Sequence, residues 1–150
     1  MSMFRDDYIL RIVEKISGMI AAIVGLKAAG QLDDALQEVE TATALLPGPT
    51  TELLPSVDSS TAATLLRQPA YIAAYARLVA EKACIQKQMG NENEAESGEE
   101  RALELALEAY KREHEPPEAL CALVDRLVSE GADKKLAESY LELLTRLRRH

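Results

Sequence analysis

The chain has 150 residues, of which 47% are apolar and 28% are charged, which suits one folded, soluble domain. A formal net charge of −8 argues against nucleic-acid backbones and anionic lipid as partners, because both attract clusters of Lys and Arg. With one Phe and no Trp, the core must be filled by Leu, Ile, Val and Ala, of which Ala and Leu favour helices. We therefore expect a single all-α domain over residues 1–150.

Cysteine usage and the N-terminal residues indicate a cytoplasmic protein. Cys84 and Cys121 are far apart in apolar helical contexts, which favours small buried side chains over a disulfide framework or a zinc site. Asp6 and Asp7 stand where a signal peptide would carry basic and apolar residues. The longest uncharged run, residues 16–26, is shorter than the about 20 residues that span a bilayer. No membrane partner is expected.

The first helix is predicted over residues 6–29, where apolar residues recur at three- and four-residue spacing. A second stripe on this helix consists of small residues: Gly18, Ala22, Gly25 and Ala29. Glycine inside a helix costs about 1 kcal/mol relative to alanine, and close approach of another helix best explains that cost. The helix is therefore predicted to be central or to lie at an interface, and a homodimer through it is expected.

A second helix is predicted over residues 32–46, between Gly30, which suits a helix C-cap, and a Pro-Gly-Pro stop signal. The connection that follows, residues 48–68, is rich in helix-capping Thr, Ser and Asp. We expect short helical turns near residues 51–54 and 61–67.

Two long helices are predicted next, over residues 69–89 and 91–113, with Gly90 between them. The first turns of the second one carry almost no apolar residue, so we expect them to stand in solvent and Gly98 to bend or fray them.

The last two helices follow the Pro-Pro pair at 116–117 and the glycine at 131. Asp133 is expected to cap the final one, which ends in basic residues that a helix C-terminus favours. No segment has the alternating pattern of a strand.

Two stretches of the chain match at an offset of about sixty residues. The matching pairs are Gly30 and Gly90, Ala35 and Ala95, and Ala42 and Ala102. The glycine turns the chain between antiparallel helices, and the alanines let the first helix pack closely on one face of the second. This spacing resembles the second half of a tetratricopeptide repeat. A third unit around Gly131 has the same shape but carries Leu136 and Leu143 in place of the alanines.

The resemblance implies antiparallel helical hairpins stacked as a short right-handed superhelix of about six main helices. The hairpin units would cover about residues 5–47, 69–113 and 116–149, with an insertion at 48–68. The chain also resembles small bacterial proteins of unknown function with this architecture. The family includes modules that clamp a peptide carboxylate with Lys and Asn, and no matching set is present here.

Three groups of side chains are candidate binding residues. Tyr71 and Tyr75 share a stripe that either lines the concave surface or fills a core short of aromatics. Glu96 and Glu100 belong to an acidic stripe with a four-residue repeat, which is either a solvated face or a docking strip for a basic partner. Arg11 belongs to a polar group at the start of the first helix, where helix capping is the alternative.

No motif predicts catalysis, a metal site or a cofactor. The only histidines are His114 and His150, and nothing local supports a pair of His114 with a cysteine. The expected function is a non-enzymatic protein-interaction module or a self-associating scaffold. The alternatives are a small-molecule sensor with a pocket near Tyr71 and Tyr75, and an enzyme that uses carboxylates and Tyr without a recognisable motif.

Overall fold

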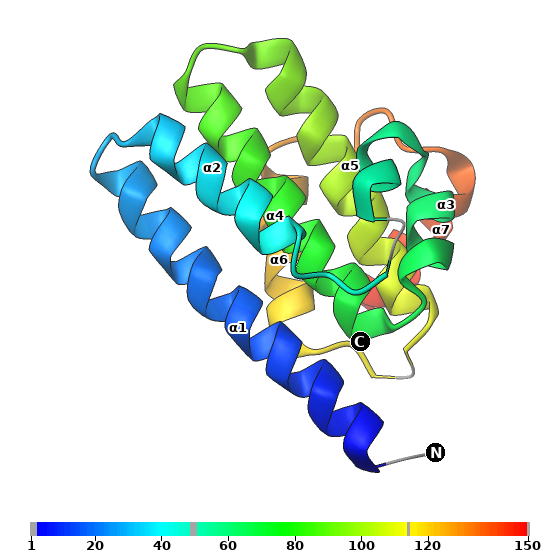
Figure 1. The fold of residues 1–150 in the computed structure, drawn as a ribbon. Coiled ribbons are helices and arrows are strands. Elements are labelled where there is room, and N and C mark those ends of the chain that lie inside the picture. Colours follow the sequence, from blue (N-terminus) through cyan, green and yellow to red (C-terminus); the bar gives the residue numbers. More distant parts are fainter. Residues whose placement is uncertain (1–2, 49–50, 114, 150) are drawn as a thin grey trace.

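A computed structural model describes residues 3–48, 51–113 and 115–149, and within them every regular element is helical (Figure 1). The eight elements are α1 (Met3–Ala28), α2 (Leu32–Thr43), the 3₁₀ helix η1 (Thr51–Ser56), α3 (Ser59–Leu66), α4 (Pro69–Gln88), α5 (Glu92–Lys111), α6 (Glu118–Ser129) and α7 (Glu138–Arg148). The predicted all-α class is confirmed, with eight helical elements in place of about six. His114 and His150 lie outside the described residues.

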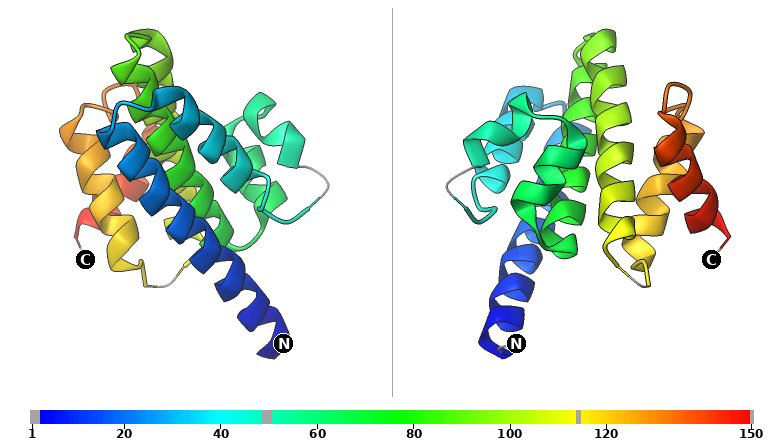
Figure 2. Two further views of the ribbon diagram at one scale, coloured as in Figure 1. Left: turned by 60° about the vertical axis from the view of Figure 1, so that its left-hand side comes forward. Right: turned by 90° about the vertical axis from the view of Figure 1, so that its right-hand side faces the viewer.

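The pair α4 and α5 forms the centre of the molecule. Helix α4 contacts α1, α2 and α3, and α5 contacts α3, α6 and α7. Figure 2 shows α1 and α2 on one side of this pair and α6 and α7 on the other. Helix α1 lies at the edge, with its first turns projecting beyond the body (Figure 2). Of the two positions predicted for this helix, the central one is therefore wrong. No helix among the described residues is long and apolar enough to cross a membrane.

Three glycines end α1, α4 and α6 with the same backbone geometry. Gly30, Gly90 and Gly131 have φ values of 75°, 87° and 87°, in the left-handed region that glycine adopts without steric cost. After each glycine, the next N–H donates to a carbonyl five residues earlier: Gln31 to Leu26 at 2.9 Å, Asn91 to Gln86 at 2.9 Å and Ala132 to Leu127 at 3.0 Å. These bonds satisfy carbonyls that a helix end leaves free, and they confirm the predicted helix stops.

The two stretches that match in sequence also bury their matching alanines in the same way. The four alanines of the repeated pattern, Ala35, Ala42, Ala95 and Ala102, are all buried. They lie on α2 and α5, the second helices of the hairpins α1–α2 and α4–α5. After Gly131 the chain instead makes further turns, and α7 begins at Glu138 with Ala137 as its N-cap residue. The prediction that Asp133 caps this helix is therefore wrong.

Gly98 marks the closest approach of α4 and α5. A Cβ atom built on Gly98 would lie 2.9 Å from Cβ of Ala83, closer than two such carbons approach in proteins. Helix α5 continues without interruption through this residue, so the predicted bend or fraying is wrong. The glycine serves helix packing instead. The prediction that the first turns of this helix stand in solvent holds only for residues 92–94, which are exposed, because Ala95 and Glu99 are buried.

The connection between α2 and α4 contains the short helices expected there. Asp58 caps α3, since its Oδ1 accepts a hydrogen bond of 2.8 Å from the N–H of Thr61. From α5, Arg101 donates to the carbonyl oxygens of Val57, at 2.7 Å, and Leu54. This guanidinium fastens the connection to the central pair of helices, because it bonds two backbone carbonyls of the connection.

Candidate functional site

The outward face of α1 carries a run of small, uncharged and exposed residues, here called the α1 ridge. The ridge consists of Gly18, Ala21, Ala22, Val24, Gly25 and Ala28. A Cβ atom built on Gly18 or Gly25 would meet nothing within 4 Å. The helix crossing predicted at this stripe is therefore absent within the described chain. Leu10, 57% exposed, lies on the same helix toward its N-terminus, and Arg11 is exposed beside it.

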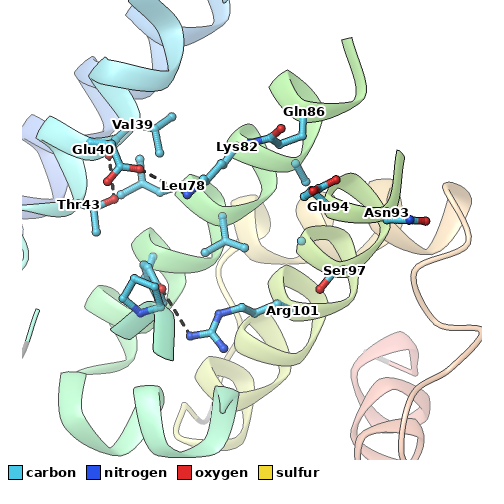
Figure 3. A pocket seen from close by; sticks show the side chains of 15 residues that line it. Val39, Glu40, Thr43, Leu78, Lys82, Gln86, Asn93, Glu94, Ser97 and Arg101 are labelled. Carbon is cyan, nitrogen blue, oxygen red and sulfur yellow. Dashed lines mark hydrogen bonds and ion pairs between the residues drawn. The ribbon is translucent and has the colours of Figure 1, made fainter. Parts of the chain in front are cut away.

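A groove with an apolar floor lies between α2, α4 and α5. The cavity has a volume of about 530 Å³ and is here called the α2–α5 groove (Figure 3). Val39, Leu78 and Val79 contribute to its floor. Across it, Lys82 of α4 reaches Glu40 of α2 with an N–O distance of 3.4 Å (Figure 3). Both side chains are substantially exposed, so this pair is weak and easily opened.

The two candidate tyrosines differ in their relation to this groove. Tyr75 is buried but lines the groove, and the guanidinium carbon of Arg101 lies 5.8 Å from its ring centroid. Tyr71 is buried and does not belong to the groove lining. Burial raises the pKa of Tyr71, nearby Tyr8 adds to the rise, and Arg5 opposes it. Tyr71 therefore contributes to the core, whereas Tyr75 contributes to both the core and the groove wall.

The acidic stripe of α5 divides into two parts. Glu96 is exposed and Glu100 partly buried, and neither takes part in an ion pair among the described residues. Further along, Glu104 accepts a hydrogen bond of 2.7 Å from the hydroxyl of Ser59, and Glu108 accepts one of 2.7 Å from the hydroxyl of Tyr140. The stripe is thus not one docking strip, because its second half holds α3 and α7 in place.

A buried charge cluster, which sequence reasoning missed, joins three helices. Glu81 of α4 is 6% exposed; one of its carboxylate oxygens pairs with the Lys27 ammonium of α1, and the other lies 3.6 Å from Nη1 of Arg126 of α6. Burial by itself would lower the pKa of Lys27, but the hydrogen bond and charge of Glu81, together with smaller contributions from Cys84, outweigh it and raise the pKa. The available signal was that Glu81 directly follows residues 71–80, which are apolar except for Arg77.

Neither a metal site nor a disulfide emerges from the described part of the chain. No group of three or more His, Cys, Asp and Glu side chains there could hold a metal ion. Cys84 and Cys121 are both free thiols. The comparisons with protein-family models, with curated proteins and with solved structures found no match to this chain.

Proposed function

We propose that the chain is a non-enzymatic protein-interaction module that self-associates through the α1 ridge. The observation that carries this proposal is the exposure of two mid-helix glycines, Gly18 and Gly25, on an uncharged face without a neighbour. Each glycine costs about 1 kcal/mol relative to alanine within one chain. A helix from a second copy, crossing at short distance, is a contact that would make the absence of side chains favourable.

The order of residues in the ridge suits an antiparallel pair of α1 helices. In a two-fold symmetric contact, residue i of one copy meets residue j of the other and the reverse. A two-fold axis between Ala21 and Ala22 sets Gly18 of each copy opposite Gly25 of its partner. Small residues therefore face small residues along the whole crossing, and the helix axes approach closely.

Charge outside the ridge supports the same arrangement. At about 1.5 Å per residue, Arg11 lies about 16 Å from the proposed axis, beyond the end of the other copy's α1 at Ala28, which is about 10 Å from the axis. There the partner copy presents the start of α2, with exposed Asp33 and Asp34. Arg11, a binding residue predicted from sequence, would thus face two acids across the interface.

Sedimentation from low to high micromolar concentration tests self-association directly. We expect the wild type to dimerise and Ala21→Glu to remain monomeric, because the variant buries a charge at the centre of the crossing. Ala122→Glu is the matched control, since Ala122 is an exposed alanine on α6, and it should dimerise like the wild type. A wild type that stays monomeric at the highest concentration would refute the proposal.

We also propose a tetratricopeptide-like architecture and a cytoplasmic location. The repeated glycine turns and buried alanines support a degenerate tetratricopeptide-like stack with the three hairpin units expected from sequence. The free thiols of Cys84 and Cys121 support a reducing cytoplasm.

A second candidate function is small-molecule binding in the α2–α5 groove. It is favoured by the cavity of about 530 Å³ with its apolar floor and the Tyr75 side chain in its wall. A thermal-shift screen against metabolites tests it, with Ser97→Trp as the blocking variant, because Ser97 is an exposed residue of the groove lining. A ligand that stabilises both proteins equally does not bind in the groove.

A further inference from the structure

A second cavity lies on another side of α4, between α4, α5 and α6. It has a volume of about 290 Å³ and is here called the α4–α6 pocket. Part of its wall is apolar, from Ala80, Ala83 and Leu127. The rest consists of the Cys84 thiol and of charged side chains of both signs: Lys87 of α4, Glu99 of α5, Arg126 of α6 and Glu130 at the C-terminus of α6. Its size suits a small metabolite rather than a peptide.

Glu99 is the unusual residue of this pocket. Glu99 is only 9% exposed, and its Oε2 atom is buried without a hydrogen-bond partner among the residues that the structure describes. An unpartnered buried acceptor is unfavourable, because it has lost its water without a replacement. Burial raises the pKa of the Glu99 carboxyl, Glu130 and Glu96 raise it further, and Lys87 opposes the rise. The Glu99 carboxyl therefore faces a second carboxylate, Glu130, with Lys87 as a nearby cation, and its Oε2 atom has no donor among the described residues.

The basic groups of the pocket also retain binding capacity. Lys87 is exposed and forms no ion pair with any described residue. Arg126 lies 3.6 Å from Glu81 and 3.5 Å from Glu130, distances too long for strong hydrogen bonds. Both cations can thus turn donors toward an anionic group in the cavity.

We propose that the α4–α6 pocket binds a small α-amino acid, with its ammonium on Glu99 and Glu130 and its carboxylate on Lys87 and Arg126. Both signs of charge meet in one small cavity, and an α-amino acid carries both on a single carbon. The apolar wall of Ala80, Ala83 and Leu127 faces a short apolar side chain. The ammonium supplies the partner that the buried Glu99 oxygen lacks.

Calorimetric titration with three probes tests the recognition of both charges. L-alanine carries both groups, ethylamine only the ammonium and propionate only the carboxylate. We expect L-alanine to bind and each half-ligand to bind at least about tenfold more weakly, since each forfeits one set of charge-assisted contacts. The proposal is overturned if L-alanine does not bind at millimolar concentration, or if ethylamine binds as tightly.

Variants locate the site. Glu99→Gln should weaken L-alanine binding about tenfold or more, whereas Glu92→Gln, at an exposed position in the first turn of α5, should bind like the wild type. Lys87→Met, at an exposed position that does not affect the core, should also weaken binding, which keeps the test valid if Glu99→Gln alters the fold. Unchanged affinity in both Glu99→Gln and Lys87→Met would overturn the assignment.

Discussion

Glycine stands in the middle of two helices of this molecule, α1 and α5, in opposite surroundings. Gly98 of α5 lies against Ala83, where even one added carbon would clash. Gly18 and Gly25 of α1 face open space. Close helix packing therefore explains the glycine of α5, whereas no contact among the described residues explains the two glycines of α1. That difference is the basis for proposing a second copy on α1.

Charge distinguishes the same two regions. The central helices hold buried carboxylates, including Glu81, Glu99 and Glu108. The α1 ridge has no charged residue, and the nearby Lys27 is turned inward to Glu81. A packed region with buried charge is sensitive to substitution, whereas an exposed uncharged face tolerates it unless a partner covers it.

The largest effect is expected for Glu81→Ala, because the Glu81 carboxylate joins α4 to α1 through Lys27. Removing this carboxylate leaves Lys27 buried without its partner and should lower the free energy of unfolding by about 3–5 kcal/mol in urea denaturation. Glu40→Ala is the control, because the pair of Glu40 with Lys82 is exposed, and should cost about 0–1 kcal/mol. Equal losses in the two variants would mean that the buried cluster does not hold α1 to the centre.

The pair of Lys27 with Glu81 should also make stability depend on alkaline pH. Because the pKa of Lys27 is raised on folding, the charged pair stabilises the native state below the ordinary lysine value of 10.5. That stability is lost as pH rises through the raised pKa. The unfolding free energy of the wild type should therefore fall in this range more steeply than that of Glu81→Ala, as measured by urea denaturation at several alkaline pH values.

Gly98→Ala is expected to have the next largest effect. The added Cβ would force α4 and α5 apart at Ala83, and overpacking of this kind costs about 1–3 kcal/mol. Thermal and urea denaturation measure the loss. If the variant were as stable as the wild type, the contact between the helices would not require glycine, and the contrast with α1 would disappear.

Sequence reasoning succeeded where the cause of structure is local. The glycine turns at Gly30 and Gly90 and the alanine spacing depend on residues within one hairpin, so the pattern alone predicted them. It failed for Gly98 because the relevant neighbour, Ala83, lies on another helix. Glu99 was missed for the same reason, since its burial depends on how α6 packs against α5.

A smaller effect is expected for Glu99→Gln. Because the pKa of Glu99 is raised on folding, its protonated form stabilises the native state at low pH, and this contribution is lost as pH rises above the ordinary value of 4.5. The amide removes that loss and can donate to Glu130, so the variant should be about 1 kcal/mol more stable near neutral pH. Glu92→Gln, at an exposed position in the first turn of the same helix, should show no such gain. Urea denaturation across acidic and neutral pH gives both curves.

The smallest effect on stability is expected for Gly25→Ala. This variant tests whether the exposed glycines of α1 serve a contact between copies, as Gly98 serves a contact within the chain. Nothing lies within 4 Å of the added carbon, so helix propensity should raise the unfolding free energy of the dilute monomer by about 0.5–1 kcal/mol. In sedimentation at high concentration the same carbon should weaken self-association, because it separates the crossing helices. Opposite signs in the two measurements identify a glycine kept for a contact between copies. A gain in stability with unchanged association would show instead that the edge glycine serves no contact, and the self-association proposal would lose its main support.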